Sequence, residues 1–247
     1  MFKISPYKLS VFQLCPRQYK FIYLDGLLDA YRQHRPYFTM GDHLHATLKD
    51  FLSLVPPGKR DLETAGQILR AKWARNRKGF DSREEEKKWG EKALLQLENF
   101  VRSEDLSAQP FLVEDYHDVQ IDENLILLGR IDRVDKKKDQ LKIIDYKTGK
   151  LNPKKVDPLQ LYCYALILEK KFRLPVVSAA YYFLGENKTI NYKPTKKKLS
   201  QALLNIKKQA KKILANKDFP ATPNQYCSTC DFLTICPRKK EAKKQKA

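Results

Sequence analysis

Residues 125–147 read LILLGRIDRVDKKKDQLKIIDYK, and the architecture of the chain follows from this stretch. Its two halves, 125–134 and 140–147, are rich in branched apolar residues and flank the charged segment DKKKD. This pattern predicts an antiparallel hairpin that turns over the charged segment. Side chains alternate along a strand, so Asp145 and Lys147 are expected to share one face.

Two carboxylates and a lysine meet on this hairpin if its register brings Asp132 across from Asp145. Paired carboxylates hold a hard cation such as Mg²⁺ or Mn²⁺. A phosphodiester bound to that cation would lie within reach of the ammonium group of Lys147. A single Asp-x-Lys is more often part of an ordinary charged hairpin whose side chains face water. The rest of the sequence has to distinguish these two interpretations.

A regular series of helices and strands surrounds the hairpin. A first helix is expected from Ser5-Pro6, with a new start at Cys15-Pro16, because proline is accepted in a first helical turn and disfavoured inside a helix. The continuous apolar character of 176–184 indicates a central strand that is covered on both faces. Apolar periodicity and capping residues predict helices at 40–54, 61–76, 82–103, 157–170 and 199–215, and strands at 111–120, 125–134, 140–147 and 176–184.

Four of the five cysteines lie near the two ends of the sequence. Cys227, Cys230 and Cys236 form a C-x2-C-x5-C arrangement, and Cys15 stands alone near the start. Three clustered thiols need a fourth ligand, and zinc is the more frequent metal for such spacing in an arbitrary cytosolic protein. Cys163 falls in the apolar stripe of a predicted helix and is expected to be a small buried hydrophobe. A disulfide framework is not expected, because the sequence shows no signal peptide.

Charge and composition favour a nucleic-acid partner. The chain has 247 residues, of which 42% are hydrophobic, so it can bury a core as one domain. Its formal net charge of +19 exceeds what solubility requires and indicates a polyanionic partner. Lysines concentrate at 193–198, on the helix at 199–215 and in a tail from Arg238 to Lys246. No apolar run is long enough to span a bilayer, so a cytoplasmic protein without a membrane partner is expected.

Several motifs, taken in this order, resemble the RecB-like nucleases of the PD-(D/E)XK superfamily. The chain looks like the branch that also contains an iron–sulfur cluster, as the CRISPR-associated RecB-like exonucleases and the nuclease domains of AddB and of the Dna2 helicase–nuclease do. The resemblance covers almost the whole chain. The matching elements are Gly41-Asp42-His43-Leu44-His45, Gly129-Arg130-Ile131-Asp132, Asp145-Tyr146-Lys147-Thr148-Gly149, Gln160-Leu161-Tyr162-Cys163-Tyr164 and the cysteines.

The resemblance implies a site for Mg²⁺ or Mn²⁺. His45, Asp132 and Asp145 would supply side-chain ligands, and Tyr146 would supply its backbone carbonyl. A carboxylate pair concentrates the cation, and the cation lowers the pKa of its bound water. Mg²⁺ prefers oxygen ligands, so a histidine ligand would fit a preference for manganese better.

The resemblance also implies three catalytic side chains beside the metal. Lys147 would help to orient or activate the attacking water and would stabilise charge on the phosphate. Gln160 and Tyr164 lie one helical turn apart, project from one face and would hold a phosphate or a base near the metal. Without the resemblance, a surface glutamine and a core tyrosine are an equally good interpretation of this pair.

For the cysteines, the resemblance implies a [4Fe-4S] cluster held by Cys15, Cys227, Cys230 and Cys236, with zinc as the alternative. Cys15 and Cys236 are each followed by proline, as in the resembled branch. Such a cluster would tie the two ends of the domain together, and its binding free energy would count as folding free energy.

The expected fold is therefore α/β, with a restriction-endonuclease-like core of α-β-β-β-α-β order and a central mixed sheet. A helical insertion and a metal cluster that joins the N- and C-terminal segments complete the expectation. The predicted divisions of a single domain 1–247 are a nuclease core at 40–54 plus 111–192, a helical insertion at 56–106, and cluster segments at 1–30 and 220–240.

The function expected from these features is that of a metal-dependent DNA nuclease. It would act as an exonuclease on single-stranded DNA or DNA ends, in DNA repair, recombination or CRISPR adaptation. The sequence contains no Gly-rich loop that ends in Gly-Lys-Ser/Thr, so a helicase or a CRISPR integrase would be a separate partner. Two alternatives stay open, a DNA-binding or scaffolding subunit of such a complex and a zinc-stapled RNA-processing nuclease.

Overall fold

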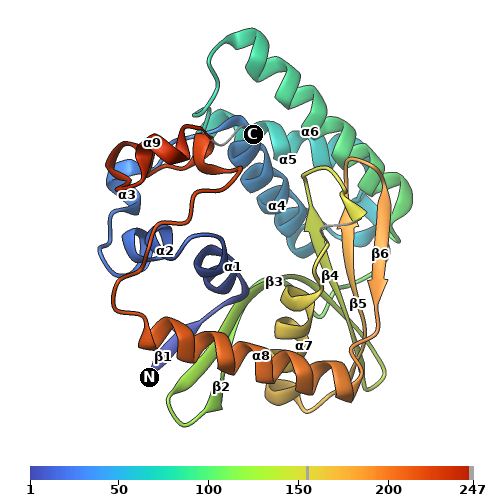
Figure 1. The fold of residues 1–247 in the computed structure, drawn as a ribbon. Helices are drawn as coiled ribbons and strands as arrows, with labels where there is room; N and C mark the ends of the chain where they lie inside the picture. Colours follow the sequence, from blue (N-terminus) through green and yellow to red (C-terminus); the bar gives the residue numbers. More distant parts are fainter. Residues whose placement is uncertain (154–155, 245–247) are drawn as a thin grey trace. The chain divides into compact units, whose positions relative to one another are not determined.

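The computed structural model describes residues 1–153 and 156–244, and it contains a mixed six-stranded sheet (Figure 1). The strand order is β1-β3-β4-β5-β6, and β2 pairs with β3 outside this path. The β1/β3 and β4/β5 pairs are parallel, whereas β3/β4 and β5/β6 are antiparallel. The predicted α/β fold with a central mixed sheet is thereby confirmed. The strands are β1 (Phe2–Ile4), β2 (Leu112–Asp122), β3 (Leu125–Lys137), β4 (Gln140–Lys147), β5 (Val176–Phe183) and β6 (Lys188–Tyr192).

The helices follow the predicted series closely. Ser5 and Asp61 cap their helices by accepting the backbone N–H groups of Lys8 and Thr64, and Ser82 accepts that of Glu85. The helices are α1 (Pro6–Leu14), α2 (Pro16–Tyr23), α3 (Leu28–Tyr31), α4 (Pro36–Leu54), α5 (Leu62–Arg75), α6 (Arg83–Ser103), α7 (Leu159–Phe172), α8 (Lys196–Ala215) and α9 (Lys239–Ala242), with short 3-10 turns at Pro57–Lys59, Cys227–Thr229 and Leu233–Ile235.

The hairpin of β3 and β4 has the register that a metal site requires. The ladder ends at the pair of Arg133 and Ile144, the neighbours of Asp132 on β3 and of Asp145 on β4. The predicted turn was too long, because β3 continues to Lys137 and β4 begins at Gln140. Lys138 adopts a φ of 52°, which closes the hairpin with only two residues.

The two faces of β4 have different neighbours, as its alternation predicts. Ile144 and Tyr146 belong to a buried cluster with residues of α4, α5 and α6 (Figure 1). Asp145 and Lys147 occupy the alternate positions, on the face where α7 contacts β4 and β5. The expectation that Asp145 and Lys147 share a face is confirmed.

The chain divides into two compact units. One comprises Met1–Gln33, Gln120–Leu127 and Gln201–Ala247, and the other comprises His34–Val119 and Leu128–Ser200. The candidate hydrolytic residues all belong to the second unit, and the four predicted cluster cysteines all belong to the first.

Within the first unit, segments from the two ends of the chain pack together. The ring of Tyr19 stacks on that of Phe219 with a centroid distance of 6.1 Å, and Phe21 contacts Phe232 at 5.3 Å. The backbone N–H of Arg17 donates to the carbonyl oxygen of Pro220. Protein contacts therefore already hold Cys15 and the C-terminal cysteines in one unit.

Some elements differ from the prediction. Helix α4 begins at Pro36 rather than at residue 40, because proline suits the first helical turn. Helix α8 begins at Lys196, and strands β1 and β6 were not predicted. The predicted basic tail to Lys246 extends beyond the described residues. None of the described helices combines the length and apolar character needed to cross a bilayer.

Candidate active site

Three side chains from three separate elements converge beside the β3/β4 hairpin. His45 comes from α4, Glu114 from β2 and Asp132 from β3, and one ligand atom of each lies within 4.8 Å of the others. The Nδ1 atom of His45 lies 2.8 Å from Glu114 Oε1 and 3.5 Å from Asp132 Oδ2. This arrangement matches the imidazole and carboxylate donors that bind a divalent cation.

Asp145 adds a second buried carboxylate to this group. It is 1% exposed and Asp132 is 7% exposed, and burial together with the charge of Asp145 raises the pKa of Asp132 well above its usual range. The Oδ2 atom of Asp145 lies 2.6 Å from Lys147 Nζ, so this carboxylate is paired with an ammonium group. The two buried carboxylates still repel each other, and a bound cation would offset that repulsion. The residues present therefore fit a metal ion.

The backbone of Tyr146 orients one of these carboxylates. Its N–H donates to Asp132 Oδ2 at 2.8 Å, which links β4 to the side chain across the hairpin. The Tyr146 ring is buried in the core between Phe100 and Tyr182. The predicted role of the Tyr146 carbonyl as a ligand stays a prediction.

Nearby carboxylates favour the protonated form of His45. Burial alone would lower the pKa of His45, but the hydrogen bond to Glu114 and the charges of Asp132, Glu114 and Asp145 outweigh it and raise this pKa to about 9. In the metal-free protein the proton thus supplies the positive charge that a cation would bring.

We expect the metal-free protein to lose stability as the pH rises from 6.5 to about 9. The pKa of His45 is raised on folding, so its contribution is complete below 6.5 and disappears as the pH passes about 9. Thermal unfolding in the presence of a chelator measures this loss, and His45→Asn should flatten it. Mn²⁺ should raise the melting temperature more at the upper end of this range than at the lower end. A profile that is the same in wild type and His45→Asn would contradict the interpretation.

A hydrogen-bonded chain runs from Asp145 to helix α7. Lys147 Nζ donates to Gln160 Oε1 at 2.8 Å, and Gln160 Nε2 donates to the Tyr164 hydroxyl at 2.8 Å. Burial, and then the charge of Asp145, raise the pKa of Tyr164, so its hydroxyl keeps its proton. The structure therefore brings together all three side chains for which a catalytic role beside the metal was predicted.

Gly129, the first residue of the Gly129-Arg130-Ile131-Asp132 motif, leaves room for the ring of Tyr164. A Cβ atom on Gly129 would lie 2.6 Å from Tyr164 Cε1, well inside contact distance. Tyr164 is almost fully buried, so its ring has little freedom to retreat.

Gly129→Ala is therefore expected to lower the free energy of unfolding by about 1–3 kcal/mol, the usual cost of overpacking. It should also reduce any activity that depends on Gln160 and Tyr164, because their positions shift with the ring. Denaturant unfolding measures the first effect. Gly149→Ala is the matched control, since a Cβ at Gly149 meets nothing within 4 Å. Equal stability of the two variants would mean that Tyr164 does not press on β3.

Glu114 was missed in the sequence. It lies in β2 with a φ of 48°, a backbone conformation that a non-glycine residue rarely adopts. This local distortion lies where its carboxylate reaches His45, which is 69 residues away in the chain. Asp115 follows Glu114 directly and Asp118 lies further along β2, so the sequence offered no signal that singled out Glu114.

The four cysteines assigned to a cluster are free thiols, none of them fully buried. The backbone N–H groups of Thr222 and Asn224 donate to the sulfur atoms of Cys15 and Cys227, at 3.5 and 3.2 Å. Burial raises the pKa of Cys230 to about 11, and the charges of Cys15 and Cys227 add to this shift. Cys163, in contrast, is fully buried in α7, as predicted.

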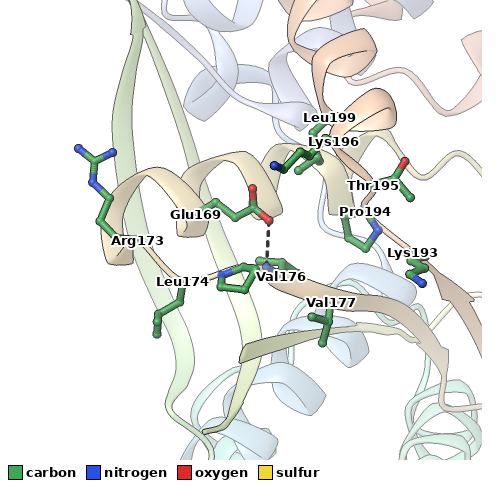
Figure 2. A pocket seen from close by; sticks show the side chains of 11 residues that line it. Glu169, Arg173, Leu174, Val176, Val177, Lys193, Pro194, Thr195, Lys196 and Leu199 are labelled. Atoms are coloured by element: carbon green, nitrogen blue, oxygen red, sulfur yellow. Dashed lines mark hydrogen bonds between the residues drawn. The ribbon is translucent and has the colours of Figure 1, made fainter. Parts of the chain in front are cut away.

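A cavity of about 400 Å³ lies at the end of α7 that is opposite to Gln160 and Tyr164 (Figure 2). Figure 2 shows Glu169 accepting the backbone N–H of Val176, at 2.9 Å, so this carboxylate fixes the start of β5. Arg173, Lys193 and Lys196 also line the cavity, whereas the predicted site residues do not. The cavity is therefore not part of the candidate active site.

Comparison with known protein families identifies the family of this chain. The family model described as the PD-(D/E)XK nuclease superfamily matches residues 3–237. No curated protein matches the chain. A solved structure described as the crystal structure of SSO0001 aligns over 97% of this chain and 87% of its own, with 13% sequence identity and a TM-score of 0.44.

Proposed function

Because the chain belongs to the PD-(D/E)XK nuclease superfamily, we propose that it is a divalent-metal-dependent deoxyribonuclease. It would hydrolyse phosphodiester bonds in single-stranded DNA or at DNA ends, as an exonuclease. The observation that supports this best is the group of His45, Glu114 and Asp132, together with the second buried carboxylate, that of Asp145.

We assign the Mg²⁺ or Mn²⁺ ligands to His45, Glu114, Asp132 and Asp145, with the Tyr146 carbonyl as a further one. A cation bound there would lower the pKa of a water molecule and stabilise negative charge on the phosphate. The imidazole of His45 makes manganese the better match, since magnesium prefers oxygen donors.

The side chains around the ligands would position and stabilise the reacting phosphate. Lys147 is held between the Asp145 carboxylate and the Gln160 amide oxygen, so its charge is fixed before substrate arrives. A preorganised charge needs no rearrangement when negative charge develops on the phosphate. Tyr164 stays protonated at neutral pH and would donate its hydroxyl hydrogen to a phosphate oxygen.

The charge of the chain supports a nucleic-acid substrate. A formal net charge of +19 favours contacts with many phosphates, and such contacts do not depend on base sequence. We therefore expect binding that weakens steeply with salt and that selects little among sequences. Anisotropy titrations at several salt concentrations measure both properties. A flat salt response, or tight binding to one sequence alone, would argue against phosphate contacts as the main source of affinity.

We further propose that Cys15, Cys227, Cys230 and Cys236 hold a [4Fe-4S] cluster, which would assign the chain to the iron–sulfur branch of the superfamily. Among the described residues, no three of these sulfur atoms lie within 4.8 Å of one another. Tetrahedral zinc with bonds of about 2.3 Å needs sulfur atoms about 3.8 Å apart. A cluster separates its thiolates further, since each binds a different iron atom.

We place this activity in DNA repair, recombination or CRISPR adaptation. A helicase or a CRISPR integrase would then be the partner that delivers a single strand or an end. This part of the proposal rests on the iron–sulfur branch and on the cysteines that suggest it.

Cleavage assays with labelled nucleic acid test the proposal. Single- and double-stranded DNA and RNA, labelled at the 5′ or the 3′ end, are incubated with Mg²⁺, Mn²⁺ or a chelator. The expected result is metal-dependent loss of label from DNA ends or single strands. Cleavage of RNA alone would reject the proposed substrate. Tight DNA binding without cleavage in either metal would instead favour the scaffolding subunit.

A further inference from the structure

Two neighbouring aromatic side chains at the start of α4 face water. Tyr37 is 42% exposed and Phe38 is 49% exposed, and their ring centroids lie 4.5 Å apart. Single exposed apolar residues are common on proteins. These two rings are tilted by 51° and contact each other, so together they form an apolar surface whose exposure to water is unfavourable unless a ligand covers it.

This aromatic pair lies on the same helix face as a candidate metal ligand. Phe38 and His45 are seven residues apart, so both project from one side of α4, with an offset of roughly 10 Å along the axis. Gly41 lies between them, and a Cβ placed on it would be 3.3 Å from Thr148 Oγ1. Thr148 directly follows Lys147, so this face of α4 meets the end of β4 where the reaction is proposed.

Exposed cationic side chains belong to segments that contact α4 near the aromatic pair. The Thr39 hydroxyl donates to the Lys78 carbonyl oxygen at 2.7 Å, and a Cβ on Gly79 would lie 2.8 Å from the Arg35 backbone. These contacts fix the loop after α5 against the first turn of α4, and the Lys78 side chain is exposed. Lys150, two residues beyond Thr148, is also exposed.

From this placement we infer that Tyr37 and Phe38 form a stacking platform for nucleobases next to the scissile phosphate, while Lys78 and Lys150 contact the neighbouring phosphates. The inference rests on the proposed function and specifies its substrate as a single-stranded segment. A single strand offers free base faces to aromatic rings, whereas a duplex keeps them stacked inside. Cations beside aromatic rings match the alternation of phosphates and bases along such a strand.

The test measures binding separately from hydrolysis. Oligothymidylate and a blunt duplex of equal length are titrated by fluorescence anisotropy against Asp145→Asn and against the same protein with Tyr37→Ala and Phe38→Ala. The double replacement should weaken single-strand binding on the order of 10- to 100-fold and duplex binding far less. Leu54→Ala, which removes an apolar side chain that is 74% exposed at the other end of α4, should change neither.

A conservative replacement separates stacking from folding. Phe38→Trp should retain single-strand affinity, and its indole fluorescence should be quenched by oligothymidylate, whereas Phe38→Leu should lose affinity despite its apolar side chain. Equal losses for both nucleic acids, or unchanged affinity in the double variant, would overturn the inference. Light scattering tests the rival occupant, a second copy of the chain. A dimer that dissociates in the double variant with DNA binding intact would also overturn it.

The hydrolytic assay keeps the two proposals distinct. In the wild-type background, the double replacement should raise KM for single strands and leave kcat nearly unchanged, since neither ring belongs to the metal site. An active wild-type enzyme whose KM does not respond would reject the platform and leave the nuclease assignment intact. Absence of cleavage in wild type would reject the nuclease, and the binding titrations would still decide the platform.

Discussion

Asp145→Asn and Lys147→Ala are each expected to reduce hydrolysis on the order of 10²–10³-fold or more, with DNA binding largely retained. Asp145 supplies one of the buried carboxylates of the proposed metal site, and Lys147 supplies the fixed positive charge 2.6 Å away from it. Neither side chain belongs to the exposed basic surface that would attract DNA, so affinity should change little. Single-turnover cleavage with Mn²⁺ measures the rate, and anisotropy measures the binding.

Two controls make this result specific. Lys142 lies on β4 and Asp139 in the turn that precedes it, and both are exposed. Lys142→Ala and Asp139→Asn should therefore cleave at nearly the wild-type rate. Circular dichroism should show that Asp145→Asn and Lys147→Ala are both folded, so that a loss of cleavage reports on the site and not on unfolding. Near-normal cleavage in Asp145→Asn or Lys147→Ala would reject the site assignment.

The second large effect is expected at the cysteines. Cys15→Ser should lower the stability of the protein as much as Cys230→Ser does. Each substitution removes one ligand of a metal site that joins the two ends of the chain. Protein prepared without air should be brown, with broad charge-transfer absorption that bleaches on reduction. Both variants should lose this colour and several kcal/mol of stability, on the order of a metal-binding free energy.

Cys163→Ala serves as the control, since this buried thiol lies in α7, outside the unit that contains the other four. It should stay brown. Metal analysis distinguishes the rival site, because Zn²⁺ is colourless. Stoichiometric zinc without iron in anaerobic protein would reject the cluster, and it would leave the hydrolytic assignment untouched.

The sequence predicted those parts of the site that depend on local patterns. Asp145 and Lys147 share a face because strand side chains alternate, and Asp132 lies next to the last pair of the hairpin ladder, where it accepts the Tyr146 N–H. Gln160 and Tyr164 contact each other because they are one helical turn apart. Each of these relations spans few residues, so a sequence pattern is enough to find it.

Contacts between segments that are far apart in the sequence could not be predicted from local patterns. Glu114 reaches His45 only through the fold and through an unusual backbone conformation, and neither has a sequence pattern. Strand β1 has three residues and β6 has five, which is too short for alternation to indicate a strand. The charged turn was predicted too long because its lysines resemble loop residues, although Lys138 alone supplies the positive φ that the turn needs.

The most direct test of the central claim, that a divalent cation binds in this group of acids, is an anomalous diffraction measurement on crystals grown with Mn²⁺. We predict a manganese peak bonded to His45, Glu114, Asp132 and Asp145, at the distances of about 2.0–2.2 Å that nitrogen and oxygen ligands adopt. The peak should disappear in Asp132→Asn crystals grown under the same conditions. Manganese bound elsewhere in the wild-type protein, with no metal peak beside these four side chains, would contradict the account.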